Sequence, residues 1–392
     1  MENEFLILFL LQALFDLQTI FAYYIKSKEE ERHGLSPRMY TALLAVVHQW
    51  PFRLDKPFIN RACLLQGMTA ANHFFTTANS SALEKYTRFD RQTFEALHMS
   101  FQVHWRGSME RVPKTRGHLQ NRALSSHTAL GLVLRWLASG AFFSDLVLTW
   151  GITVGTVSRN LFFSLKCLVK SLESCPEAAL TISAERLVAI GNQVGDELGE
   201  DMHGCCIVID GSLHLLEQDE SAQLNYFYDE KHPDYNGWKG KYCKKGLYFF
   251  SFDGLIIWHC VLCPGGWHDG LLFDQASNFL AHLPAGCWIL RDSAFPRIEG
   301  KVYRCRKDNE LLPSDPEKAQ KQLAVEALSG KLRLSSEWGI KDLKRVWRIF
   351  DNPLPSDSPV HQRLIFKAAM HLNNYRIQKM GISQILNSLG IE

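Results

Sequence analysis

The chain has 392 residues, of which 46% are hydrophobic and 21% are charged. This composition is typical of a soluble globular protein with a large core, and it excludes disordered, collagen-like and coiled-coil classes. The formal net charge is only +2, so overall charge does not identify a nucleic-acid binder and any basic surface must come from local clustering. The length predicts two or three domains.

The ten cysteines are scattered without a regular framework, and the adjacent pair Cys205 and Cys206 lies in an apolar run. In a chain of this length, such a pattern favours buried thiols in a reducing compartment. We therefore expect a nuclear or cytoplasmic protein.

The first apolar stretch, Phe5 to Ile25, has the hydrophobicity of a signal or membrane segment. Asp16 interrupts it, and an aspartate at bilayer depth costs about 3 kcal/mol. The residues before it are acidic, where a signal peptide has positive charge. The sequence predicts an amphipathic packing helix here and no membrane association.

The part of the chain up to about residue 180 is predicted to be helical. Apolar residues recur at three- and four-residue spacings over Arg38 to Trp50, Asp90 to Phe101 and Ser126 to Ala138. The segment from Arg106 to Arg122 combines five basic residues with Gly107, Pro113 and Gly117, which indicates a basic loop.

A helix-turn-helix pattern lies in this half. A short helix starting near Ser144 and ending at Trp150 is followed by Gly151 as the turn residue, Thr153 as an N-cap and a second helix from Val154 to Lys170. Ile152 and Val157 would pack inward, and the residues able to face DNA are Thr156, Ser158 and Arg159. An ordinary helical hairpin with a capped second helix remains the alternative.

Beyond about residue 204 the pattern changes to β-rich runs separated by turn signals: Cys205 to Ile209, Gly246 to Phe252, Leu255 to Leu262 and Cys287 to Leu290. Helical spacing returns over Asp269 to Leu283 and Ser335 to Phe350. The chain is thus predicted to be α+β, with a helical half, a boundary near residues 180 to 203, and an α/β half in which helices flank a mixed sheet.

Three acidic residues in the second half occupy positions suited to a metal site. Asp210 and Asp292 each follow a β-rich run, so both are expected at the ends of neighbouring strands, where carboxylates can share Mg²⁺ or Mn²⁺. Glu337 opens the predicted helix from Ser336 and supplies a third carboxylate. Two divalent ions held in this way can support phosphodiester cleavage. Alternatively, the aspartates form turns and Glu337 interacts with the helix dipole or with Lys341.

Basic side chains accompany these acids. Lys341, Lys344 and Arg348 follow Glu337 at spacings of four, three and four and would share one helix face, able to hold a phosphate backbone or simply solvated. A second basic run interleaves Tyr235, Trp238 and Tyr242 with lysines; it suits a nucleic-acid backbone or an exposed hairpin, and its lysines are Lys231, Lys239, Lys241, Lys244 and Lys245.

Two further motifs contain potential metal ligands. Asp269, in Gly265-Gly266-Trp267-His268-Asp269, either caps the next helix or joins the metal site. His259-Cys260-Val261-Leu262-Cys263 contains a single C-x-x-C. Because strand alternation should place its two thiols on opposite faces, zinc binding there is not expected.

The ordered motifs resemble those of PIF/Harbinger-type DDE transposases and the nucleases derived from them. They are Ile209-Asp210-Gly211-Ser212, Pro264 to Asp269, Leu290-Arg291-Asp292-Ser293-Ala294-Phe295-Pro296, Glu337 with Leu343-Lys344-Arg345 and Trp347, and Met370-His371-Leu372-Asn373-Asn374. The resemblance covers about residues 85 to 380. Leu290-Arg291 and Trp338-Gly339 differ from the family's usual residues or spacing.

The resemblance implies an RNase H-like catalytic core with Asp210, Asp292 and Glu337 as its metal-binding triad. It also implies cleavage of double-stranded DNA, with or without strand joining, a Myb-like accessory protein and a homo-oligomer. The expected domains are a helical extension (1–84), a helical DNA-binding region (85–180) and the nuclease domain (204–380). A catalytically silent DNA-binding or scaffold protein and a hydrolase of small phosphoesters remain alternatives.

Overall fold

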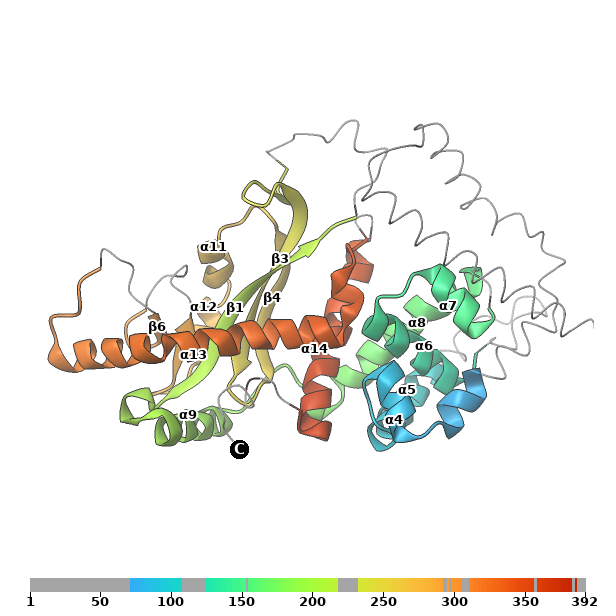
Figure 1. Cartoon of the computed structure of the whole chain (residues 1–392), viewed down its shortest axis with the longest axis horizontal. Helices are drawn as coiled ribbons and strands as arrows, with labels where there is room; N and C mark the ends of the chain where they lie inside the picture. The colour runs from blue at the N-terminus through green and yellow to red at the C-terminus, as the bar shows by residue number, and fades with distance from the viewer. Residues whose placement is uncertain are drawn as a thin grey trace, which may run out of the picture. The chain divides into compact units, whose positions relative to one another are not determined.

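The computed structural model describes residues 71–107, 124–152, 154–217, 232–291, 295, 298–304, 310–355, 358–382 and 385 (Figure 1). These residues lie within the compact unit Leu64–Glu392. The apolar stretch Phe5 to Ile25, the helix expected over Arg38 to Trp50, most of the basic loop, Thr153, Lys231 and Asp292 lie outside the described residues.

The first described part is helical, as expected. Its named helices are α4 (Ser80–Thr87), α5 (Arg91–Gly107), α6 (Ser126–Ser139), α7 (Phe143–Trp150) and α8 (Val154–Glu173). Local sequence sets several of the ends: Asn79 and Ser125 accept backbone N–H bonds as N-caps, while Gly140 and Gly151 end helices in the left-handed conformation. Helix α8 packs against α5, α6 and α7.

The stretch expected as the boundary, residues 180–203, contains a further helix. Between the short turns η1 (Pro176–Ala178) and η2 (Glu200–Met202), Ser183 caps α9 (Ala184–Leu198). Helix α9 packs on the first strand. Its Gly191 approaches Gly204 so closely that a Cβ atom would lie 2.8 Å from the Gly204 Cα.

The second part is built on a mixed six-stranded sheet. Its strands are β1 (Cys205–Leu215), β2 (Tyr235–Asn236), β3 (Lys241–Ser251), β4 (Ile256–Pro264), β5 (Trp288–Arg291) and β6 (Val302–Arg304). The order is β2-β3-β1-β5-β6, with β4 also paired to β3. Pairing is antiparallel among β1, β3 and β4 and parallel among β1, β5 and β6. All four β-rich runs predicted from the sequence fall largely within strands.

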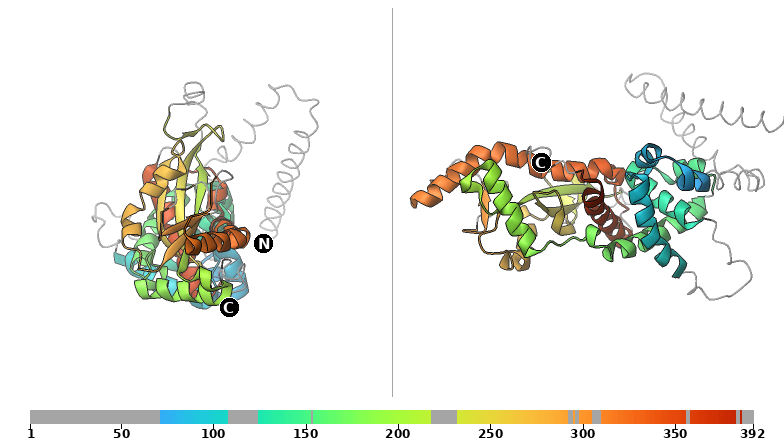
Figure 2. Two further views of the ribbon diagram at one scale, coloured as in Figure 1. Left: turned by 90° about the vertical axis from the view of Figure 1, so that its left-hand side faces the viewer. Right: turned by 90° about the horizontal axis from the view of Figure 1, so that it is seen from below.

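Within the described residues, the named helices that follow or interrupt the strands are α11 (Asp269–Asp274), α12 (Ser277–Ala281), α13 (Pro316–Val346) and α14 (Pro359–Met380), with the 3₁₀ turn η3 (Arg348–Asp351) between the last two. Helix α13 begins about 20 residues earlier than predicted, because Asp315 accepts N-capping bonds and Pro316 occupies the first turn. The helix contacts β1, β3, β5 and β6. Figure 2 shows it, in orange, lying along the sheet.

Close packing between α13 and the sheet depends on a glycine. A Cβ atom on Gly339 would lie 3.0 Å from three ring atoms of Phe250 on β3, a distance tighter than normal carbon contacts. The absence of a side chain at Gly339 therefore lets the helix backbone approach the sheet at this point.

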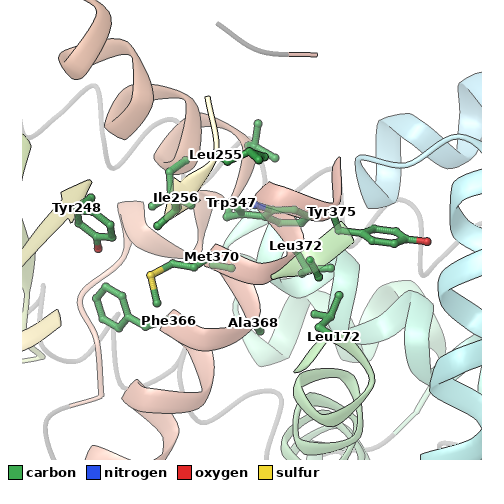
Figure 3. Close-up of a cluster of buried hydrophobic side chains, with 14 of the residues drawn as sticks. Leu172, Tyr248, Leu255, Ile256, Trp347, Phe366, Ala368, Met370, Leu372 and Tyr375 are labelled. Carbon is green, nitrogen blue, oxygen red and sulfur yellow. The ribbon is translucent and has the colours of Figure 1, made fainter. Parts of the chain in front are cut away.

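Helix α14 connects the sheet with the first helices. It contacts both α8 and β4, and Figure 3 shows its Met370 and Leu372 among buried side chains that include Leu172 of α8 and Ile256 of β4. Asn374 accepts a hydrogen bond from Ile256 N (2.9 Å) and donates to Ile256 O (2.8 Å) and Ala179 O (2.6 Å). The late Leu-His-Asn-like motif therefore supplies structural contacts.

None of the helices in the described part of the chain is long and apolar enough to cross a membrane. The eight cysteines within that part are free thiols, six of them buried and two half-buried.

Candidate active site

Asp210 lies in the middle of β1, which corrects the prediction that it ends the strand. The strand continues to Leu215 because Gly211 keeps its pairing with Leu247 of β3. The carboxylate is half-buried and its Oδ1 accepts a bond from Gly211 N (2.8 Å). Strand alternation places Asp210, Ser212 and His214 on one face, the face to which the paired Tyr248 also belongs.

The parallel pairing of β1 and β5 fixes the register of these two strands. Val208 of β1 pairs with Leu290 of β5. Asp210 comes two residues after Val208, and Asp292 comes two residues after Leu290. Asp292 itself lies outside the described residues, and the described part of β5 ends at Arg291.

Arg291, the residue before Asp292 in the sequence, is buried. Its guanidinium lies 4.7 Å from the centre of the Phe273 ring and 5.5 Å from that of Phe295. Such cation–π contacts favour a desolvated guanidinium. The chain thus carries a buried arginine directly before Asp292.

Lys344 reaches the Asp210 side of the sheet from α13. Its Nζ donates to the carbonyl of Leu213 on β1 at 3.1 Å. Burial lowers the pKa of Lys344, and the negative charges of Asp351 and Asp210 partly counteract that shift. This part of the predicted basic helix face is therefore directed at the sheet beside Asp210.

Glu337 lies two helical turns before Lys344 and on the same side of α13. It does not open the helix as predicted, because α13 starts at Pro316. Its Oε2 lies 3.0 Å from Nζ of Lys341, so the surface ion pair considered from the sequence is present.

Arg348 does not share this helix face. Helix α13 ends at Val346, and Arg348 begins η3, where its Nε lies 3.1 Å from Oδ2 of Asp351. The prediction of a shared helix face from the four-three-four spacing is wrong for Arg348, because the helix ends before this residue.

Asp269 belongs to the other side of the sheet. It lies in the first turn of α11, whose N-cap is His268, and its Oδ1 is 3.2 Å from Nζ of Lys245. Lys245 and Tyr248 are three residues apart on β3, so they face opposite sides. Lys244 pairs with Asp234 at 2.7 Å. Two lysines of the basic run thus have carboxylate partners within the chain.

Two further lysines of that run lie at the tip of the β2–β3 hairpin: Lys239 in the turn and Lys241 at the start of β3. Lys239 and Lys241 are exposed, and Trp238 between the strands is 91% exposed. Asn236 holds the tip: its Oδ1 accepts from Lys239 N (2.9 Å) and its Nδ2 donates to Gly265 O (2.8 Å). The hairpin therefore presents an aromatic ring and two cations on an ordered turn.

The helix pair α7–α8 has the arrangement of buried positions expected from the sequence. Gly151 adopts the left-handed conformation at the end of α7, and Ile152 and Val157 are buried. Arg159 is exposed, while Thr156 and Ser158 are half-buried. These three polar residues lie in the first two turns of α8.

The C-x-x-C pair differs from the prediction. The Sγ atoms of Cys260 and Cys263 are 3.2 Å apart. The register of β3 and β4 shifts near this point and Leu262 has a φ of 64°, so the bulge cancels the strand alternation that would have separated the thiols. Hydrogen bonding from Cys263 lowers the pKa of Cys260 to about 7.

Two groups of residues were not predicted from the sequence. Glu95, His98 and His127 place potential ligand atoms within 4.8 Å of one another; the signal available was Glu and His three residues apart on a helix. A groove of about 480 Å³ between α5, α8 and α14 is lined in part by four basic side chains, Lys166, Lys170, Arg363 and Lys367.

A known protein family matches part of the chain. Residues 216–374 match the family described as DDE superfamily endonuclease. The matched range contains Asp292 and Glu337 and begins six residues after Asp210. No curated protein and no solved structure matches the chain. The family match indicates an enzyme of the nuclease type.

Proposed function

We propose that the protein is a divalent-metal-dependent endonuclease of the DDE transposase type, similar to the PIF/Harbinger group, and that it cleaves double-stranded DNA. The observation that carries the proposal is the parallel pairing of β1 with β5. Val208 of β1 pairs with Leu290 of β5, and Asp210 and Asp292 each come two residues later in the sequence. This register supports the proposal that the two carboxylates are neighbours, because residues at equivalent places in adjacent parallel strands lie side by side.

The strand order supports an RNase H-like core. A meander of three antiparallel strands (β1, β3, β4) joins two further strands (β5, β6) that run parallel to β1. Helix α13 packs on this sheet and carries Glu337 two turns from Lys344, which contacts β1. The third acid is thus on the helix that covers the Asp210 side.

The donor set fits Mg²⁺ or Mn²⁺, because Asp210, Asp292 and Glu337 offer carboxylate oxygens, the ligands that hard cations prefer. Two bound divalent ions would supply an activated water and stabilise the leaving oxygen. The Asp210 carboxylate is half-buried, and the hydrogen bond that its Oδ1 accepts from Gly211 N orients it. Lys344 contributes positive charge beside Asp210.

We assign DNA contacts to exposed cations and to the start of α8. Lys239 and Lys241 closely follow Trp238 at the hairpin tip and are exposed, whereas Lys244 and Lys245 already have carboxylate partners. Thr156, Ser158 and Arg159 would position the duplex from α8, as in a helix-turn-helix. A Myb-like accessory protein and self-association, both implied by the resemblance, complete the proposal.

Cleavage of supercoiled plasmid with Mg²⁺ or Mn²⁺ tests this function. Wild type should nick the plasmid, and Asp210→Asn, Asp292→Asn and Glu337→Gln should each abolish nicking while leaving the circular dichroism spectrum and duplex binding intact. Asp274→Asn, an exposed acid of α11, is the matched control and should nick like wild type.

Two outcomes would change the assignment. If wild type binds duplex DNA but does not cleave under either metal, the fold serves recognition and the protein is a silent relative. If the three site variants cleave as fast as wild type, the catalytic acids are elsewhere. Turnover of a small phosphoester without plasmid cleavage would indicate a different hydrolase.

A further inference from the structure

A second group of metal-ligand side chains lies among the first helices, outside the proposed nuclease site. Glu95 and His98 are one turn apart on α5, and His127 is the second residue of α6. His98 is buried and the other two are half-buried. The proposed cleavage chemistry uses none of them.

The distances within the group suit a small transition-metal ion. Oε2 of Glu95 lies 3.2 Å from Nε2 of His127 and 3.9 Å from Nδ1 of His98. Zinc bound to nitrogen and oxygen at about 2.0–2.1 Å in tetrahedral geometry separates its ligand atoms by roughly 3.3 Å. Side-chain adjustments of less than a bond length would therefore bring all three atoms into coordination.

The other polar atoms of two ligands are already occupied. Nε2 of His98 lies 2.8 Å from Oγ of Ser126, and Oε1 of Glu95 accepts a bond from Arg91 at 2.8 Å. Outer contacts of this kind orient metal ligands and fix the histidine tautomer. They leave Nδ1 of His98 and Oε2 of Glu95 directed toward each other.

The facing atoms of these side chains can offer lone pairs to a cation. If Nε2–H of His98 donates to Ser126, Nδ1 carries a lone pair, and two acceptors face each other. The imidazoles of His98 and His127 also stack with centroids 3.4 Å apart, which disfavours two charged rings.

We propose that Glu95, His98 and His127 form a zinc site that joins α5 to α6, with a water molecule as the fourth ligand. Three protein ligands and one open position are an established zinc arrangement. The site lies between the helix that precedes residues 108–123 and the helix that follows them, and this intervening segment carries Arg111, Lys114, Arg116 and Arg122. Bound zinc thus fixes both flanks of the basic segment.

The test uses the full chain stripped of metal with a chelator. Zinc competition against a chromophoric indicator should give one tight equivalent per chain, and Co²⁺ should give the visible absorption of a tetrahedral complex. Glu95→Gln, a nearly isosteric change, and His127→Gln should each remove that equivalent. Ser126→Ala, which removes only the outer contact, should weaken zinc binding about 10- to 100-fold.

Three control variants locate the bound metal. His104→Gln changes another histidine of α5, Cys260→Ser removes a thiol, and Asp210→Asn alters the proposed nuclease site; all three should retain the tight equivalent. The proposal is wrong if wild type does not bind one tight equivalent of zinc, or if Glu95→Gln binds zinc like wild type. It is also wrong if Cys260→Ser or Asp210→Asn loses the tightly bound zinc. Because the readout is zinc binding, failure of DNA cleavage does not affect the result.

Discussion

Replacing Asn374 by alanine should destabilise the protein strongly, because this one amide joins three elements. The side chain is fully buried and makes three hydrogen bonds: one from Ile256 N, one to Ile256 O and one to Ala179 O. At about 1 kcal/mol of net stability for each hydrogen bond, the loss is about 3 kcal/mol. The Ile256 groups left behind are also buried, so this figure is a lower estimate.

Urea unfolding followed by tryptophan fluorescence measures the effect. With a denaturant dependence of about 3 kcal/mol/M, the midpoint should fall by about 1 M urea. Asn278→Ala, on the exposed surface of α12, should stay within about 0.5 kcal/mol of wild type. Asn374→Asp keeps the size but loses both donated bonds and should be at least as unstable at neutral pH. A midpoint for Asn374→Ala equal to that of the control would refute the structural role of this amide.

Three further predictions concern the hairpin, a buried histidine and the paired thiols. Trp238→Ala should weaken duplex or single-strand binding by about 1–3 kcal/mol if the ring stacks on a base; unchanged affinity in a fluorescence anisotropy titration would exclude that contact. Burial lowers the pKa of His259 from 6.5 to about 4, with contributions from His371 and Lys367, so the free energy of unfolding should fall as pH falls across this window, and His259→Phe should reduce the slope. Mild oxidation should remove two hydrogen atoms from Cys260 and Cys263, a mass change that Cys260→Ser should abolish.

The sequence predicted the main strands well because each is a continuous apolar run bounded by Gly, Pro or Asp. It misplaced Asp210 because Gly211 and Ser212 have the composition of a turn, whereas Gly211 continues the ladder with β3. Pairing with the neighbouring strand determines where β1 ends, and the local amino-acid composition does not encode that pairing.

Helix α13 shows a different limit. The segment from Pro316 to Ser335 is too polar to give a clear amphipathic pattern, so only its apolar end was predicted; the Asp315-Pro316 cap was the available signal. The Cys260 and Cys263 thiols meet because of a bulge. His127 reaches Glu95 from 32 residues away, a tertiary contact that a linear reading of Glu95-x-x-His98 cannot supply.

The lack of a side chain at Gly339 has a consequence for the chemistry of the proposed site. The Phe250 ring packs against the backbone of α13 at Gly339. This contact, two residues from Glu337, therefore sets the distance between the helix and the strands. That distance determines how far a carboxylate must extend to reach the sheet. An aspartate at this position would be shorter by one carbon–carbon bond, about 1.5 Å, and a bulkier residue in place of the glycine would lift the glutamate instead. The length of the Glu337 side chain and the absence of a side chain at Gly339 thus together set the distance between the carboxylate and the sheet.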